Sequence, residues 1–155
     1  MSERIIDTER ALPAPADVLP HRPPFLFVDT LERLEPGSSA AGTWALRGDE
    51  WFFPGHFPGR PTLPGVLMCE AIAQVGAIAV LTDERFAGKL PLFGGLDGAR
   101  FRKQVSPGDT LELSVELGRM SARAGKGSGM AQLVGADGTR ATACECELMF
   151  VLVDG

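Results

Sequence analysis

Apolar residues occupy nearly the whole circumference of one predicted helix, which runs from Gly65 to Leu81. This segment contains one carboxylate, Glu70, and one amide side chain, Gln74. Because a helix that is hydrophobic on all sides is buried inside a protein, we predict that this helix lies in the core. A buried helix requires another layer of structure around it.

The C-terminal half has a strand pattern that can supply this layer. Between Thr110 and Leu117, leucine and valine alternate strictly with glutamate and serine, which predicts a strand with one buried face. Further runs, separated by turn signals, predict strands at Phe25–Leu34, Ser38–Arg47, Leu92–Lys103, Met130–Val134 and Thr139–Val153. We therefore predict an α+β fold in which a largely antiparallel sheet wraps around one long central helix.

Two segments carry glycine or proline patterns instead. Residues 11–24 contain five prolines, which predicts an irregular lead with one helical turn near Asp17 to Leu19. The stretch Gly125-Lys126-Gly127-Ser128-Gly129 lacks the residue order of a phosphate-binding loop, so we interpret it as the mobile end of a hairpin. The sequence thus predicts one domain over residues 1–155, with residues 1–18 as an irregular N-terminal lead.

Composition narrows the class of protein. The chain has 155 residues, of which 45% are hydrophobic and 23% charged, as in an ordinary globular domain. Its net charge of −5 gives no general attraction to nucleic acid or to an anionic membrane. The longest apolar run, Ala71 to Leu81, is too short to span a bilayer, and we expect a cytoplasmic protein.

Cysteine usage indicates reduced thiols. The chain has three cysteines, Cys69, Cys144 and Cys146, and the last two share one face of a predicted strand without forming an ordinary disulfide. Cys69 has no histidine at a catalytic spacing, so we interpret it as a small buried hydrophobe. No zinc-binding spacing is present, so we expect no metal, and we also expect no cofactor.

The candidate chemistry rests on one histidine and one carboxylate. His56 lies in the proline- and glycine-rich stretch from Phe52 to Pro61, and histidine has an unperturbed pKa of roughly 6.5, which suits proton transfer near neutrality. Glu70 lies among apolar residues, where a carboxyl group tends to keep its proton. Each residue also has an alternative without a catalytic role. His56 would be a structural residue that bonds to loop carbonyls, and Glu70 would pair with an arginine such as Arg60. We interpret His21 as a structural residue of a proline turn, outside the site.

Several motifs together carry a resemblance to a known family. They are Leu19-Pro20-His21-Arg22, Phe25-Leu26-Phe27-Val28-Asp29, Gly55-His56-Phe57-Pro58-Gly59-Arg60-Pro61, Pro64-Gly65-Val66-Leu67, Glu70-Ala71, Ala73-Gln74, Arg100-Phe101-Arg102, Pro107-Gly108-Asp109 and Glu147-Leu148-Met149-Phe150. Over about residues 19 to 154 the chain resembles the hot-dog-fold 3-hydroxyacyl-acyl-carrier-protein dehydratases of the FabZ-like group. This resemblance implies an antiparallel sheet wrapped around a helix. It also implies homodimers that commonly assemble as trimers of dimers, with active sites at the dimer interface.

The resemblance implies roles for His56 and Glu70, and the geometry of the predicted helix suggests supporting roles for Gly65 and Gln74. His56 would take the C2 proton of the substrate, and Glu70 would protonate the departing C3 hydroxyl. The N–H of Gly65, at the start of the helix, would stabilise the charge on the thioester oxygen. Gln74 stands one helical turn after Glu70 and would orient its carboxyl group by a hydrogen bond.

The substrate gives further candidates. Six residues are candidates to line the apolar acyl channel: Phe25, Phe53, Phe57, Phe93, Phe101 and Met149. The alternative for each of them is ordinary packing in the core. An acyl carrier protein is acidic, so the basic residues Arg100, Arg102 and Lys103 are candidates for its docking, against the alternative of a solvated strand face. The chain has no tyrosine, and Pro23 and Gln104 depart from the family pattern at positions that affect the shape of the channel.

Three function classes follow from these residues. We expect a dehydratase in fatty acid synthesis or a related acyl-chain pathway. The alternatives are an acyl thioesterase of the same fold and a non-catalytic module that binds an acyl carrier protein. The presence of both His56 and Glu70 favours the dehydratase, and a glutamate in place of aspartate at position 70 separates the chain from the isomerising dehydratases.

Overall fold

The computed structural model describes residues 11–155. Its elements are α2 (Pro15–Val18), β1 (Thr30–Glu35), β2 (Ser39–Ala45), α3 (Gly65–Leu81), the 3-10 helix η1 (Glu84–Phe86), β3 (Lys89–Phe101), β4 (Thr110–Met120), β5 (Ala124–Val134) and β6 (Arg140–Asp154). The first ten residues of the predicted irregular lead lie outside the described part. The rest of the lead contains one helical turn, α2, which starts at Pro15 because proline suits the first position of a helix.

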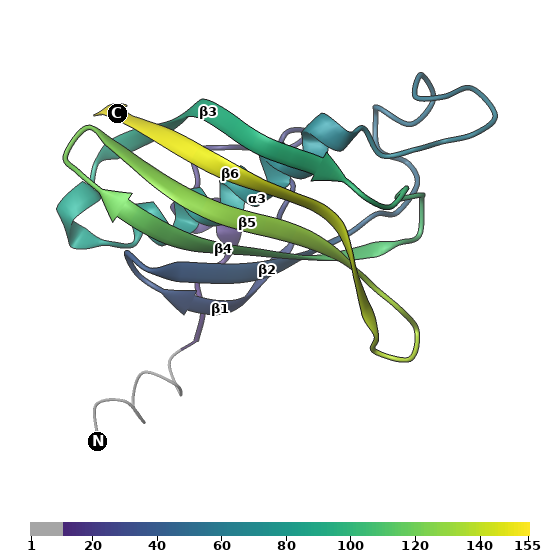
Figure 1. The fold of residues 1–155 in the computed structure, drawn as a ribbon, viewed down its shortest axis with the longest axis horizontal. Helices are drawn as coiled ribbons and strands as arrows, with labels where there is room; N and C mark the ends of the chain where they lie inside the picture. Colours follow the sequence, from purple (N-terminus) through teal and green to yellow (C-terminus); the bar gives the residue numbers. More distant parts are fainter. Residues whose placement is uncertain (1–10) are drawn as a thin grey trace.

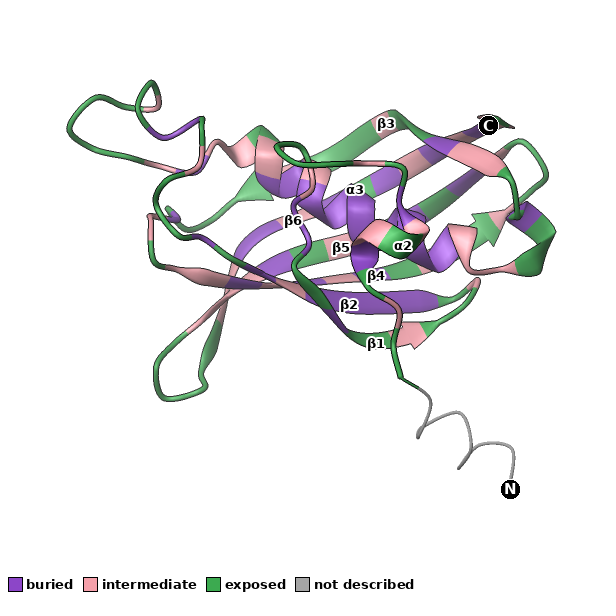
Figure 2. Cartoon of the chain, turned by 180° about the vertical axis from the view of Figure 1, so that it is seen from behind, coloured by how far each residue is buried: buried purple, intermediate pink, exposed green. Residues whose placement is uncertain are grey.

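One six-stranded sheet curves around the long helix α3 (Figure 1). The strand order is β1-β2-β4-β5-β6-β3, and each neighbouring pair is antiparallel. Figure 2 shows the buried helix α3 lying against the sheet. The segment that contains α2 covers the side of α3 that faces away from the sheet. The predicted α+β arrangement of a helix wrapped by an antiparallel sheet is therefore confirmed.

The helix α3 has the bounds that its apolar pattern predicted. Every residue from Ala71 to Val80 is buried, and the helix packs against β2, β3, β4, β5 and β6. Gly76 allows a close approach to the sheet, because a Cβ at this position would lie 2.8 Å from the ring of Phe150. Within residues 11–155, no helix combines the length and the apolar character that a bilayer crossing needs.

The first predicted strand begins later than its sequence pattern indicated. Strand β1 starts at Thr30, whereas the prediction placed the start at Phe25. The backbone of Phe25 and Phe27 bonds to a side chain of the helix instead of to a strand. The side-chain nitrogen Nε2 of Gln74 donates to the carbonyl of Phe25 at 3.0 Å, and the N–H of Phe27 donates to Oε1 of Gln74 at 2.8 Å.

The interpretation of residues 125–129 as a mobile hairpin end is wrong. These residues lie inside β5, where Gly127 pairs with Leu117 of β4 and with Leu148 of β6. At Gly129 a Cβ would collide with Cγ2 of Ile72 on α3 and would lie 2.9 Å from the carbonyl oxygen of Ser114. This glycine therefore serves close packing between the sheet and the helix.

The three cysteines are free and buried, and they gather where α3 meets β6. The sulfur atoms of Cys69 and Cys144 lie 3.9 Å apart, and Cys146 lies two residues further along the same strand face. Cys69 is 1% exposed, in agreement with its interpretation as a small buried hydrophobe.

Candidate active site

His56 is held in the loop before α3 by three hydrogen bonds. Its N–H donates to the carbonyl of Phe53 at 3.1 Å, and its own carbonyl accepts from the N–H of Thr62 at 2.7 Å. The ring nitrogen Nδ1 lies 2.8 Å from the carbonyl oxygen of Thr62. Because a carbonyl oxygen only accepts hydrogen bonds, Nδ1 carries the hydrogen and Nε2 has the free lone pair. This is the tautomer that a histidine base requires.

His56 opens into a cavity of about 730 Å³ at the start of α3. Gly65 lines the same cavity, and a Cβ at this position would lie 2.8 Å from the ring of Phe101. The N–H of Gly65 belongs to the first turn of the helix and has no hydrogen-bond partner within residues 11–155. The lone pair of His56 and the free donor of Gly65 thus belong to one cavity.

Glu70 lies on α3 with a side chain that is 18% exposed. Burial raises the pKa of its carboxyl group above the usual value, whereas the hydrogen bond from Gln74 and the neighbouring His21 lower it. The net effect is a carboxyl group that keeps its proton to higher pH than an exposed glutamate. The alternative pairing with Arg60 is wrong, because Nη2 of Arg60 bonds instead to Oε1 of Gln104 at 3.3 Å.

Gln74 connects the helix to the N-terminal segment. Besides its bonds to the backbone of Phe25 and Phe27, its Nε2 donates to Oε2 of Glu70 at 3.0 Å. This is the contact expected from their four-residue spacing. Gln74 is 1% exposed, and both its amide oxygen and its amide nitrogen are hydrogen-bonded. Its fixed side chain therefore holds the Glu70 carboxyl group in one orientation.

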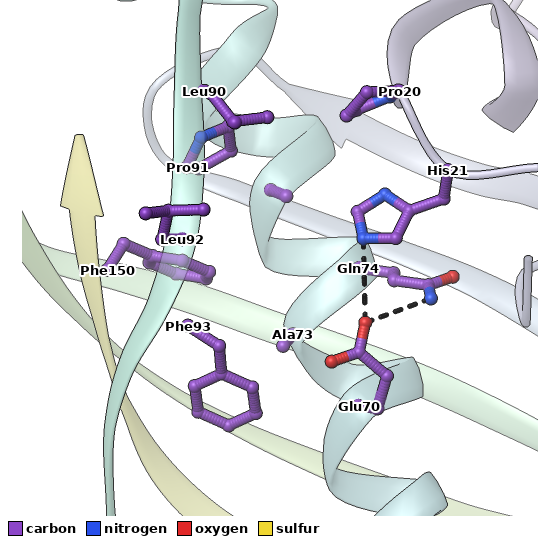
Figure 3. A pocket seen from close by; sticks show the side chains of 11 residues that line it. Pro20, His21, Glu70, Ala73, Gln74, Leu90, Pro91, Leu92, Phe93 and Phe150 are labelled. Atoms are coloured by element: carbon purple, nitrogen blue, oxygen red, sulfur yellow. Dashed lines mark hydrogen bonds and ion pairs between the residues drawn. The ribbon is translucent and has the colours of Figure 1, made fainter. Parts of the chain in front are cut away.

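The structure places His21 beside Glu70, whereas the sequence analysis left it outside the site (Figure 3). Nε2 of His21 lies 3.6 Å from Oε2 of Glu70. No local spacing connects the two residues, because His21 precedes the first strand and Glu70 lies on the helix. The signal that the sequence offered was a titratable residue in a stiff turn flanked by prolines.

Glu70 and His21 line a second cavity of about 300 Å³ (Figure 3). The remaining lining residues are Pro20, Ala73, Gln74, Ala77, Leu90, Pro91, Leu92, Phe93 and Phe150. This cavity is mainly apolar, with the carboxyl group at one side. His56 is not among its lining residues, and Glu70 does not line the cavity of His56. Within one chain, the candidate base and the candidate acid therefore open into different cavities.

The acyl-channel candidates fall in different places. Phe57 and Phe101 line the His56 cavity, and Phe93 lines the Glu70 cavity. Phe53 is 3% exposed and lines neither of them, because it packs against Phe52 in the core. The two others also lie elsewhere: Phe25 is exposed beside Phe27, and Met149 lines a separate hollow over β4, β5 and β6.

The three basic candidates lie at or near the end of β3. Arg102 and Lys103 line the His56 cavity, whereas Arg100 is exposed outside it. Nη2 of Arg102 also forms an ion pair with Oε1 of Glu145 at 2.6 Å. Among residues 11–155, no three His, Cys, Asp or Glu side chains come together as a metal-binding group.

A known protein family and several of its members match most of this chain. The model of a FabA-like domain matches residues 19–145. A 3-hydroxyacyl-acyl-carrier-protein dehydratase FabZ of Moorella thermoacetica is 50% identical over 135 residues, which cover 87% of this chain and 91% of the relative. The corresponding FabZ of Chloroflexus aggregans is 52% identical over 137 residues, which cover 88% of this chain and 92% of the relative.

Solved structures agree on the fold. The dehydratase heterocomplex ApeI:P of Xenorhabdus doucetiae matches with a TM-score of 0.73 at 17% identity, covering 94% of this chain and 93% of the other. An acyl-CoA hydrolase of Staphylococcus aureus matches with a TM-score of 0.58 at 17% identity, covering 75% of this chain and 65% of the other. At these identities the likeness concerns the fold alone, and it confirms the predicted hot-dog arrangement.

Proposed function

Because this chain belongs to the FabA-like domain family and its FabZ relatives are about half identical to it, we propose that it dehydrates 3-hydroxyacyl-acyl-carrier-protein thioesters to trans-2-enoyl thioesters. The observation that carries the proposal is the partly buried carboxyl group of Glu70. It faces an apolar cavity, and burial raises the pKa of the carboxyl group above its usual value. Such a group suits the protonation of a poor leaving group.

The proposed reaction moves two protons. Nε2 of His56 accepts the C2 proton, and the electron pair of the C2–H bond forms the C2–C3 double bond. The C3–O bond breaks, and Glu70 gives its proton to the leaving hydroxyl, which departs as water. The free N–H of Gly65 stabilises the negative charge that develops on the thioester oxygen. The proton then returns from His56 to Glu70 through solvent.

We further propose that the site is completed by a second copy of the chain. The separation of His56 and Glu70 into two cavities supports this arrangement. Strand β3 lies at the edge of the sheet, and it exposes Leu92, Phe93 and Leu96. An unpaired apolar edge is suited to pairing with the same edge of another copy around a two-fold axis. Such pairing would continue the sheet and place one copy against the Glu70 cavity of the other.

The basic residues at the His56 cavity support docking of an acidic carrier protein. Lys103 has no ion pair among the described residues, and Arg102 shares its charge with Glu145. Because the chain as a whole carries a net charge of −5, attraction to the carrier depends on this local patch. The larger trimer of dimers and the cytoplasmic location expected from the sequence stay predictions.

The direct test supplies a purified 3-hydroxyacyl carrier substrate and follows the enoyl product by absorbance and mass. We expect His56→Ala and Glu70→Gln each to lower kcat by about 10²- to 10⁴-fold, the range for loss of one acid or base. Glu116→Gln removes an exposed carboxylate of β4 and serves as a control with unchanged rate. Gel filtration verifies that every variant keeps the assembly of the wild type.

Two results would contradict the proposal. Release of a free 3-hydroxy acid without an enoyl product would identify a thioesterase instead. Wild-type rates in either the His56 or the Glu70 variant would remove that residue from the mechanism.

A further inference from the structure

Two nitrogen atoms face the same oxygen of the Glu70 carboxyl group. Nε2 of Gln74 donates to Oε2 at 3.0 Å, and Nε2 of His21 lies 3.6 Å from the same atom. In Figure 3 the other oxygen, Oε1, points away from both nitrogens, on the side of the cavity where Phe93 lies. The two carboxyl oxygens therefore have different surroundings.

The other ring nitrogen of His21 determines which tautomer fits this place. Nδ1 is buried and has no hydrogen-bond partner within the described residues. A hydrogen on Nδ1 would be a buried donor without an acceptor, whereas a hydrogen on Nε2 faces the acceptor Oε2 of Glu70. The arrangement therefore favours the tautomer with its hydrogen on Nε2, where it faces Glu70. Catalytic contacts in a protein without substrate are often slightly long and tighten when substrate binds.

The backbone around His21 is fixed on the other side by Arg22. Its Nη1 donates to the carbonyl of Leu19 at 2.9 Å and to the carbonyl of His21 at 2.6 Å. Among the described residues that line the cavity, from the lead, α3, β3 and β6, only His21 and Glu70 can titrate. The surroundings of the carboxyl group thus contain one histidine and no competing charge.

We propose that His21 is a positioning residue for Glu70: together with Gln74 it donates N–H bonds to Oε2, so that the carboxyl proton resides on Oε1 and faces the substrate. This role rests on the dehydration proposed above. A proton on Oε2 would point toward two donors and away from the leaving hydroxyl. With Oε2 occupied, the acid has one productive arrangement in place of two.

A matched pair of amide substitutions separates the donor from other properties of His21. In His21→Gln the amide nitrogen reaches the position of Nε2, so the donor to Oε2 is kept. In His21→Asn the amide nitrogen reaches only the position of Nδ1, so the donor is lost. His21→Leu removes the donor and keeps much of the volume. Circular dichroism and gel filtration verify that all three variants fold and assemble as the wild type does.

Kinetics provide the first measurement. We expect His21→Asn and His21→Leu to lower kcat about tenfold with KM changed less than threefold, and His21→Gln to stay within about threefold of the wild type. Loss of an N–H donor to the carboxylate raises the pKa of Glu70, so the alkaline limb of the kcat profile moves to higher pH in the Asn and Leu variants. In the Gln variant this limb stays in place. Equal kcat and equal limbs in all three variants would overturn the proposal.

A measurement without substrate separates this proposal from the proposed function. Carbon-13 NMR of protein labelled at the glutamate side chains follows the Glu70 titration directly, with Glu70→Gln used to assign the signal. We expect the same order as in the kinetics, with a higher midpoint in the Asn and Leu variants than in the wild type and the Gln variant. One midpoint in all four proteins would overturn the role of His21. If the Glu70 midpoints follow the expected order but the wild type forms no enoyl product, the dehydration is refuted and the role of His21 at Glu70 is kept.

Discussion

At the scale of single residues, the surroundings of Glu70 set its chemistry. The apolar residues of α3 remove most of the water from its carboxyl group, which favours the protonated form. The hydrogen bond from Gln74 and the neighbouring His21 act in the opposite direction and stabilise the anion that remains after proton transfer. An acid that gives up and regains a proton in each turnover requires both influences.

The raised pKa of Glu70 predicts how stability depends on pH. Between its usual pKa of 4.5 and the raised pKa of the folded state, the folded protein binds a proton at Glu70 that the unfolded chain has released. The free energy of unfolding therefore falls as pH rises from the usual pKa through the pKa of the folded state. Glu70→Gln removes this dependence, so we expect the variant to gain stability relative to the wild type as pH rises.

Urea unfolding at a series of pH values from acidic to alkaline provides the measurement. Glu116→Gln, which changes an exposed carboxylate, should follow the wild type throughout. A constant difference between the wild type and Glu70→Gln over the whole series would show that Glu70 titrates as an exposed group.

Local motifs identified some of the candidate residues, and long-range contacts account for those that were missed. His56 and Glu70 stood out because each has an unusual setting within a few residues of sequence. His21 did not, because its neighbour on the helix belongs to a different part of the chain. Phe53 was a channel candidate by residue type, but the aromatic cluster of the core contains it.

At the scale of secondary-structure elements, the helix was predictable and one strand was not. The apolar pattern of α3 is complete within its own sequence, and its predicted bounds agree with the structure. The glycines of β5 carry no such pattern, because their neighbours on β4, β6 and α3 determine their conformation. Glycine in an isolated sequence indicates flexibility, whereas between two strands it indicates a close approach.

Two glycine substitutions test this interpretation of β5. Gly129→Ala places a methyl group against Ile72 and 2.9 Å from the carbonyl oxygen of Ser114. We expect it to lower the free energy of unfolding by about 1–3 kcal/mol, as overpacking does. Gly118→Ala on β4 is the matched control, because its nearest atom would be the carbonyl oxygen of Lys126 at 3.6 Å.

Urea denaturation of both variants gives the comparison. The control should stay within about 0.5 kcal/mol of the wild type, as surface substitutions usually do. Equal stability of the two variants would indicate that β5 adapts freely and that Gly129 is not required for packing.

At the scale of the whole molecule, the arrangement of the two cavities fits an active site that is shared by two copies of the chain. His56 and Glu70 are fourteen positions apart in sequence, yet they open into separate cavities. The exposed edge of β3 borders the Glu70 cavity through Leu92 and Phe93. Sequence alone contains no information on whether a site is formed by one copy or two, since both arrangements use the same residues.

Mixed dimers of two inactive variants test the shared site. Co-expression of His56→Ala and Glu70→Gln with different affinity tags allows the mixed species to be isolated. If each site takes its base from one copy and its acid from the other, one of the two sites is intact. We expect about half of the wild-type activity per dimer, measured by enoyl formation.

The parent variants set the baseline for this experiment. Each should retain less than about one hundredth of the wild-type rate. If each site were formed within one chain, every site in the mixed dimer would lack either its base or its acid. Activity at the baseline would therefore contradict the shared site.

The amide side chain of Gln74 has a consequence for protein engineering. It bonds the backbone of Phe25 and Phe27 as well as the carboxyl group of Glu70. Position 74 therefore cannot be varied to retune the acid without also releasing the segment that leads into β1. A designer who wishes to change the acidity of Glu70 alone has more freedom at position 21, whose side chain forms no other hydrogen bond within residues 11–155.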